Sequence, residues 1–210
     1  RYVAHFTVEG WSSAETRAKV SALRELYRYA GVEIANAAPL ALRGNPFLPL
    51  YPVAPMNGGR WLPTHGVFAP GRLKDFHAAF EAWKASHAAE MRAHEITMTR
   101  MFVPVGSSAC IYEPTFYWPD SRTPAQARLA PSDYLAKVNS KPDNPNGRAL
   151  VFRLRKELTE LMGAHVAQHF QIGKWYPYKS KLAPEAQGLI ASLKRELDPD
   201  NLLNPGALEL

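Results

Sequence analysis

Residues 95–118 read EITMTRMFVPVGSSACIYEPTFYW, and they carry the clearest indication of the fold class. Two runs rich in β-branched and aromatic residues, 95–103 and 108–118, flank a turn around Gly106. This pattern predicts two antiparallel strands joined as a hairpin. Upstream, the sequence predicts a further strand over 60–69, so the hairpin belongs to a larger sheet.

Three segments show apolar residues at helical spacing. They cover 72–90, 146–163 and 184–197, and the third begins with Pro184 in its first turn and stops at Asp198-Pro199. The residues expected to be buried are Leu73, Phe76, Phe80 and Trp83 in the first helix, Val151, Leu154, Leu158 and Leu161 in the second, and Leu189, Ile190, Leu193 and Leu197 in the third.

The beginning of the chain predicts a β-α-β unit. Residues 2–8 alternate like a strand, a capping box formed by Ser12 and Glu15 opens a helix that ends at Gly31, and 32–37 form a second short strand. The Pro-rich segment 38–60 is expected to be an irregular loop that touches another domain or the substrate. A short helix is expected over 132–139, and a short strand over 165–170.

This order of elements predicts an α+β fold. The helix that begins after Ser12 also carries an apolar stripe, formed by Val20, Leu23, Tyr27 and Ala30. We expect an antiparallel sheet covered on one face by helices, which would bury all four apolar helix stripes. A ferredoxin-like architecture, possibly duplicated, fits the order, and residues 1–210 are taken as one domain.

Composition narrows the class of protein. Of 210 residues, 46% are apolar and 21% charged, as in globular proteins, and no run approaches the roughly 20 apolar residues of a membrane span. The single Cys110 fits a reducing compartment, so we expect a cytoplasmic protein. The net charge is +6, but the basic residues are scattered apart from a run at 148–156 on a predicted helix, so nucleic-acid binding ranks last. A start at Arg1 indicates a fragment of a longer polypeptide, or a processed one.

The end of the chain carries a more specific pattern. Residues 193–206 read LKRELDPDNLLNPG, a helix end followed by an Asp-Pro break and an extended Asn-Pro-Gly exit. Asn-Pro-Gly alone is typical of an ordinary helix terminus. The whole string resembles the last segment of the FAD-linked oxidase family, which ends in "LDPxxxLNPG".

Other segments resemble different branches of that family. Residues 163–174, GAHVAQHFQIGK, resemble the "G…EHGIGxxK" segment of the lactate- and glycolate-oxidising branch, with Gln168 in place of the Glu and one extra residue before Ile172. Residues 60–71, RWLPTHGVFAPG, resemble the strand and turn of the aryl-alcohol and alkylphenol branch, and 6–10 resemble the start of the cap domain. The implied substrate is therefore either a 2-hydroxy acid or a 4-alkylphenol or aryl alcohol.

The resemblance implies a vanillyl-alcohol-oxidase-type fold. In that fold an N-terminal domain binds FAD and a C-terminal cap forms the substrate pocket over the flavin. The resemblance implies that this chain is the cap domain and that the cofactor is FAD. Its first partner would be the FAD-binding domain of the same polypeptide, and the resemblance is also consistent with a homodimer. The sequence has no Gly-rich phosphate-binding loop, so the chain alone is expected to be inactive.

Candidate catalytic residues come from this comparison and from residue chemistry. His169 matches the His of the family's "EHG", and an imidazole suits a base that deprotonates a hydroxyl. Arg100, on the predicted strand 95–103, would contact a substrate anion or the flavin, and Tyr112 on the adjacent strand would line the same region. A hydrogen-bonded structural His and an exposed sheet Arg are the alternatives.

The remaining candidates surround this site. Those expected to bind substrate are Lys174, Tyr176, Tyr178 and His65, and those expected to contact the cofactor are Asn204 and Asn201. No His, Cys, Asp or Glu spacing in the sequence indicates a metal site. The alternative function is a stand-alone ligand-binding or interaction module, whose partner site would be the apolar 38–60 loop.

Overall fold

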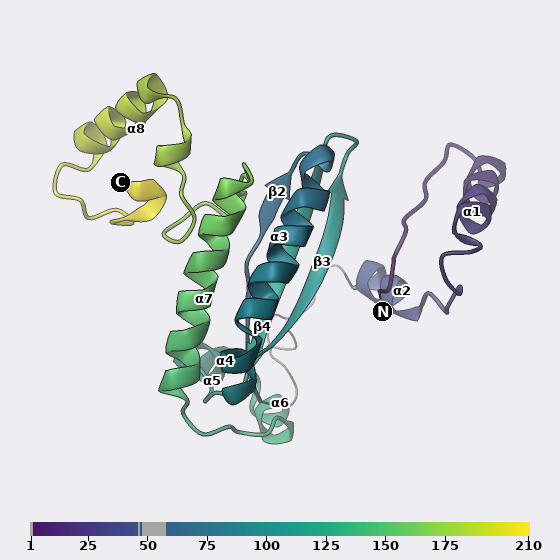
Figure 1. Cartoon of the computed structure of the whole chain (residues 1–210), viewed down its shortest axis with the longest axis horizontal. Coiled ribbons are helices and arrows are strands. Elements are labelled where there is room, and N and C mark those ends of the chain that lie inside the picture. Colours follow the sequence, from purple (N-terminus) through teal and green to yellow (C-terminus); the bar gives the residue numbers. More distant parts are fainter. Residues whose placement is uncertain (1, 46, 48–57) are drawn as a thin grey trace. The chain divides into compact units, whose positions relative to one another are not determined.

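The computed structural model describes residues 2–45, 47 and 58–210 of the chain (Figure 1). The chain divides into two compact units, Arg1–Leu50 and Tyr51–Leu210. The first unit contains helices α1 (Ser13–Tyr27) and α2 (Ala37–Gly44). All described strands belong to the second unit.

The first unit agrees with the sequence only around α1. Ser12 caps this helix, because its hydroxyl accepts a hydrogen bond from Glu15 N at 3.2 Å, while the Glu15 carboxylate accepts one from Trp11 N at 2.7 Å. The strands predicted over 2–8 and 32–37 are wrong: both stretches lack regular structure as far as it is described, apart from Ala37, which begins α2. Alternation alone forms no strand where no partner strand accepts its backbone hydrogen bonds.

Part of the Pro-rich segment is also corrected. Helix α2 occupies its beginning, with Pro39 in the first turn, where a missing N–H costs no helical hydrogen bond. Most of the remainder of 38–60, namely 46 and 48–57, lies outside the described residues.

The second unit is built on an antiparallel sheet of four strands. They are β1 (Arg60–Pro63), β2 (Gly66–Phe68), β3 (Thr97–Val105) and β4 (Ala109–Trp118). The predicted hairpin is confirmed: β3 and β4 pair along their whole length, and Gly106 turns the chain with a φ of +59°. Strands β1 and β2 pair with the opposite edge of β4.

The predicted strand 60–69 is present but interrupted. Pro63 pairs with Thr115 and Gly66 with Tyr112, so β1 and β2 keep one register across Thr64 and His65. Opposite the interruption stands Pro114, which has no N–H to donate to the ladder. One bond remains there, from Thr64 N to the Pro114 carbonyl at 2.9 Å.

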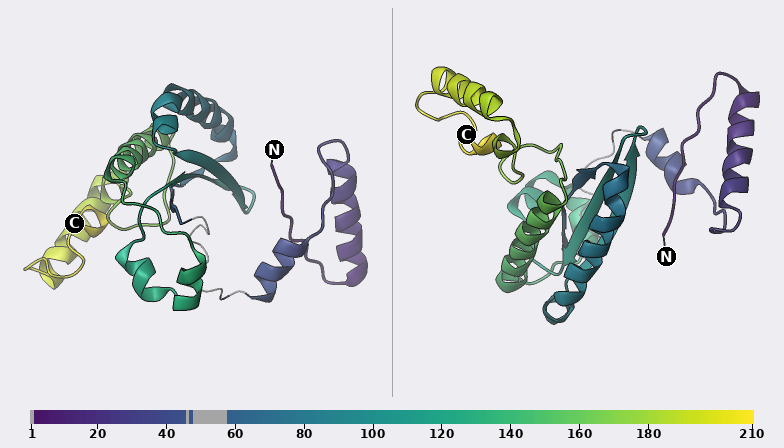
Figure 2. Two further views of the ribbon diagram at one scale, coloured as in Figure 1. Left: turned by 90° about the horizontal axis from the view of Figure 1, so that it is seen from below. Right: turned by 45° about the horizontal axis from the view of Figure 1, so that its top comes forward.

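Helices cover one face of this sheet. Helix α3 (Leu73–Ser86) continues through His87 into α4 (Ala88–Ala93), and α7 (Pro145–Ala164) packs beside α3 against the strands (Figures 1 and 2). The short helices α5 (Pro124–Leu129) and α6 (Ser132–Lys137) lie between β4 and α7 in the chain. The sequence predicted α6 but not α5. The mixed, antiparallel α+β class is thus confirmed.

The core confirms the predicted stripes of α3 and α7. The buried cluster consists of Phe68, Phe76, Phe80, Met91, Ile96, Tyr112, Phe116, Trp118, Val151, Leu154, Leu158, Met162 and Ala167, and Leu73, Trp83 and Leu161 pack against it. On β4, alternate side chains from Tyr112 to Trp118 point into this core, as one face of a strand requires.

Helix α8 (Pro184–Leu197) has the predicted bounds but not the predicted burial. Leu189, Leu193 and Leu197 are 62%, 51% and 77% exposed. Its periodicity correctly indicates an amphipathic helix, but it does not say what covers the apolar side. The α1 stripe is likewise uncovered, since that helix has no buried residue. None of the described helices is long and apolar enough to cross a membrane.

The strand predicted over 165–170 shrinks to a single bridge. Val67 N donates to the Gln168 carbonyl at 2.8 Å, and Gln168 N donates back to the Val67 carbonyl at 3.0 Å. Val166, with a φ of +62°, breaks the extended backbone just before it. The bridge pairs with β2 along the edge that β4 does not occupy.

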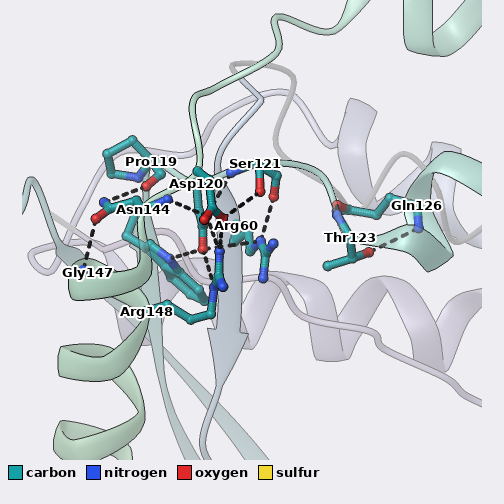
Figure 3. Close-up of polar contacts among 11 residues, drawn as sticks. Arg60, Pro119, Asp120, Ser121, Thr123, Gln126, Asn144, Gly147 and Arg148 are labelled. Atoms are coloured by element: carbon teal, nitrogen blue, oxygen red, sulfur yellow. Dashed lines mark hydrogen bonds and ion pairs between the residues drawn. The ribbon is translucent and has the colours of Figure 1, made fainter.

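A buried carboxylate joins the sheet to the start of α7 (Figure 3). Asp120 is fully buried and accepts two hydrogen bonds from Arg148, at 2.8 and 2.9 Å, with Arg60 at 3.4 Å. Trp118 Nε1 and the backbone N–H groups of Ser121 and Asn144 also donate to it. Every partner is a donor, so this network fixes the fold around an ionised carboxylate.

Candidate functional site

Three of the predicted site residues meet at the edge of the sheet. His65 lies in the interruption between β1 and β2, whereas His169 and Tyr176 lie on the segment after α7. The His169 ring stacks on the Tyr176 ring with centroids 4.4 Å apart, and the His65 ring is 5.6 Å from His169 and 4.6 Å from Tyr176. With Arg155 of α7, these residues form what we call the histidine cluster.

Hydrogen bonds to the His65 backbone hold the cluster together. His65 N donates to the Tyr176 hydroxyl at 2.9 Å, and the His65 carbonyl accepts from His169 Nδ1 at 2.8 Å. These two side chains satisfy backbone groups of an edge strand that no neighbouring strand pairs at this point. The cluster is therefore built into the fold rather than resting on its surface.

Hydrogen bonds to the two rings determine which nitrogen of each imidazole carries the proton. A carbonyl can only accept, so His169 carries its proton on Nδ1, and its Nε2 is a bare acceptor in the neutral form. His65 Nε2 accepts a hydrogen bond from Phe170 N at 3.1 Å, which places the His65 proton on Nδ1. His65 Nδ1 and His169 Nε2 are both buried and have no partner among the described residues.

Burial keeps both imidazoles neutral. It lowers the pKa of His65 to about 4, and the neighbouring His169 and Arg155 act in the same direction. Burial also lowers the pKa of His169, against the hydrogen bond to the His65 carbonyl that raises it, and Lys181 lowers it further. A neutral imidazole with a free Nε2 can accept a proton, which is what a general base requires.

Arg155 adds a half-buried cation to the cluster. Its guanidinium packs 4.1 Å from the Trp175 ring centroid and 5.7 Å from that of Tyr176. Burial lowers its pKa, although a hydrogen bond to Tyr176 opposes this. Within the described part of the chain no carboxylate forms an ion pair with Arg155, and its Nε has no partner. No sequence pattern pointed to Arg155, because a charged residue in a basic helical run usually faces solvent.

Arg100 and Tyr112 belong to a different group of residues. Arg100 forms an ion pair with Glu81 of α3, and the fully buried Tyr112 shares a hydrogen bond of 2.9 Å with His77 Nδ1. Both lie on the face of the sheet that α3 covers. The predicted catalytic trio is therefore divided: His169 joins the histidine cluster, and Arg100 and Tyr112 sit beneath α3.

The chain end lies beside the loop that carries Tyr176. Leu208 N donates to the Gly173 carbonyl at 2.7 Å. The Glu209 carboxylate accepts from Tyr178 N at 3.0 Å, and from Ser180 through its N at 2.8 Å and its hydroxyl at 3.0 Å. Sequence reasoning missed Glu209, because a charged residue near a chain end carries no pattern.

The other predicted contacts remain accessible. Lys174 is exposed and Tyr178 partly so. Asn201 and Asn204 are exposed in left-handed backbone, with φ of +51° and +47°, as the turn residues predicted. Among the described residues, neither side-chain amide has a hydrogen-bond partner, so both are available to a bound molecule. Cys110, in contrast, is a buried thiol on β4.

The described residues include no group of three or more His, Cys, Asp or Glu that could hold a metal ion. No protein-family model, curated protein or solved structure matches this chain. The candidate site therefore stands on its geometry: a buried and a half-buried neutral imidazole, an aromatic wall and a half-buried guanidinium.

Proposed function

We propose that this chain is the C-terminal, substrate-binding part of an FAD-dependent oxidoreductase that oxidises a small alcohol, either a 2-hydroxy acid or a 4-alkylphenol or aryl alcohol. The observation that carries the proposal is the histidine cluster. His65 and His169 come from the two segments that resemble different branches of the FAD-linked oxidases. They lie 104 positions apart and share a hydrogen bond.

The unpartnered atoms of the cluster suit a hydroxylated substrate. A hydroxyl group both donates and accepts hydrogen bonds. Both atoms are buried, so the side chains that cover them would have to move as the substrate enters; His169 Nε2 would then accept its proton, and His65 Nδ1–H would donate to its oxygen. Arg155 would offset negative charge that remains on the substrate, and the Tyr176 and Trp175 rings would form an apolar wall.

The exposed tail suits contact with a cofactor held elsewhere in the polypeptide. A flavin, when bound, would supply the electron chemistry by taking up a hydride from a C–H bond of the substrate. Asn201 and Asn204 would contact the ring through their free amides. Leu208 and Glu209 tie this tail to the loop that carries Tyr176, so the same segment would border both cofactor and substrate.

We also propose a ferredoxin-like architecture for the second unit. Its chain order is strand (β1 with β2), helix α3, strands β3 and β4, helix α7, and the bridge at Gln168. Across the sheet the order is Gln168, β1 with β2, β4, β3. This order is the one expected for a β-α-β-β-α-β unit whose last strand is reduced to one bridge.

The proposed activity is tested on the intact polypeptide that contains this chain. We expect the purified protein to show flavin absorption that bleaches on addition of a lactate-like acid or a 4-alkylphenol. His169→Gln should slow this bleaching by about 10²- to 10⁴-fold, the usual contribution of a general base. His94→Gln is the matched control, because His94 lies outside the cluster at the end of α4. An intact polypeptide that contains no flavin contradicts the proposal.

The exposed leucines of α8 favour the alternative, a ligand-binding or interaction module without activity. Leu189, Leu193 and Leu197 form an uncovered apolar stripe of the kind that partner proteins cover. The flavin spectrum separates the two candidates. An interaction module would carry no flavin, and a partner protein would still cover the apolar stripe of α8.

A further inference from the structure

We propose that His65 is a positioning residue, which holds the His169 ring in place and fixes Nε2 as its free nitrogen. The catalytic meaning of this role rests on the proposed function, but the role itself is a property of the chain alone. It follows from one backbone contact, one side-chain contact and the charges around the two rings.

The first contact selects the tautomer of His169. The His65 carbonyl accepts a hydrogen bond from His169 Nδ1 at 2.8 Å, and this bond stabilises the Nδ1–H tautomer of His169. In the Nε2–H tautomer the carbonyl would face an unprotonated nitrogen and the hydrogen bond would be lost. The carbonyl also faces away from β4, at a position where the ladder is interrupted. A strand residue paired on both sides would have no free carbonyl to offer.

The second contact anchors the backbone next to His169. His65 Nε2 accepts from Phe170 N at 3.1 Å, with Gln171 N at 3.5 Å, and the Phe170 ring lies 4.1 Å from the His65 ring. Phe170 follows His169 directly, so this contact sets where the His169 Cα stands. Because His65 is only 1% exposed, the anchor is fixed by packing.

The anchor works only while His65 is neutral. A proton on Nε2 would turn an acceptor into a donor that faces the N–H of Phe170. The ionisable groups that face the two rings are Arg155, Tyr176 and Lys181, and the two cations among them disfavour a further positive charge. Neutral His65 and a single tautomer of His169 therefore occur together.

The test is a nitrogen NMR spectrum of the histidine rings in the full 210-residue chain, without flavin. In the unaltered chain we expect His169 to carry its proton on Nδ1 and to titrate below an ordinary histidine. His65→Gln offers an acceptor near the place of Nε2 and should preserve both features. His65→Leu keeps the backbone carbonyl but removes the Nε2 that accepts from Phe170 N. The anchor of the neighbouring backbone is then lost, so the ratio of the Nδ1–H to the Nε2–H tautomer of His169 should fall by about fivefold, the weight of one net hydrogen bond, and the pKa of His169 should rise towards its ordinary value. His94→Gln is the control and should change neither.

The outcomes separate positioning from packing. If folded His65→Leu keeps the Nδ1–H tautomer and the pKa of His169, the His65 side chain only fills space and the proposal is overturned. If His65→Leu does not fold, His65→Asn decides in the same way, because its shorter side chain cannot reach Phe170 N. A fixed tautomer in a protein whose intact polypeptide holds no flavin would overturn the proposed function and leave the positioning role supported.

Discussion

His65 links folding to proton uptake. Its pKa is about 4 in the folded chain and about 6.5 in an unfolded one. Above pH 6.5 both states are neutral at this ring. As the pH falls from 6.5 to 4, only the unfolded chain takes up a proton at this ring. The free energy of unfolding therefore decreases by up to about 3 kcal/mol because of this residue. Urea unfolding at pH 7, 5 and 4 checks this, and His65→Gln should show a shallower decline; an equal decline in both proteins would contradict it.

Asp120 is a second buried ionisable residue, with the opposite sign of pH dependence. Burial raises its pKa, but hydrogen bonds from Arg148, Asn144 N and other donors outweigh burial and hold the pKa below its ordinary value. The stabilisation is therefore present above about pH 4, where both states are ionised, and is lost as the pH falls below it.

Replacing this carboxylate should destabilise the fold. We expect Asp120→Asn to lower the free energy of unfolding by about 3 kcal/mol at pH 7, because it leaves Arg148 and Arg60 facing an amide in a buried network. Asp143→Asn is the matched control: Asp143 also pairs with Arg148 but is 63% exposed. Urea midpoints decide, and equal losses for the two variants would show that Asp120 has no special role.

Helices α7 and α8 carry similar apolar stripes but differ in burial. Leu158 of α7 is fully buried, so Leu158→Ala should cost about 2–5 kcal/mol of unfolding free energy. Leu189 of α8 is 62% exposed, and Leu189→Ala in this chain should change stability by less than about 0.5 kcal/mol. Chemical denaturation measures both, and a large loss for Leu189→Ala would show that α8 is covered in solution.

The sequence predicted burial and strand pairing correctly where the partner element is also encoded by a strong local pattern. The hairpin 95–118 and the stripes of α3 and α7 are of this kind, since each buries the other. For α1 and α8, in contrast, the sequence predicted the helix but not its uncovered apolar side. Residues 2–8 and 165–170 have the alternation or composition of strands, but a strand exists only where another strand pairs with it. Helix α5 begins with a capping box at Thr123 and Gln126 that the irregular, Pro-rich surroundings concealed.

The candidate site could be predicted only in part, for a similar reason. His65, His169 and Tyr176 were chosen from a resemblance and from residue chemistry, and no spacing indicated that they meet. Their meeting depends on the edge of the sheet at His65, where no strand pairs with the side that faces away from β4, so the His65 N–H and C=O bond to the side chains of Tyr176 and His169. Arg155 was missed because helical periodicity does not distinguish a charge at the border of a core from one in solvent.

The two units of the chain differ in the number of buried apolar residues that could stabilise them. The buried core draws its residues from positions 68–167, all in the second unit. No described residue of the first unit is buried, and its apolar side chains include Trp11, which is fully exposed, and Leu26, which is 74% exposed. Apolar burial is the main favourable term in folding, so the second unit has the means to fold alone and the first does not.

Deleting residues 1–50 tests this difference. We expect the remaining chain to keep its cooperative urea transition, with a free energy of unfolding within about 0.5 kcal/mol of the undivided chain, because no core residue is removed. The peptide 1–50 should show weak helical circular dichroism and no cooperative transition, since a 15-residue helix such as α1 is marginal without a packed face. A cooperative transition in that peptide, or a loss of several kcal/mol on deletion, would mean that the exposed side chains of the first unit are covered in solution. The protein surface that covers them would then be the next structural question, and under the proposed function it would belong to the flavin-binding domain.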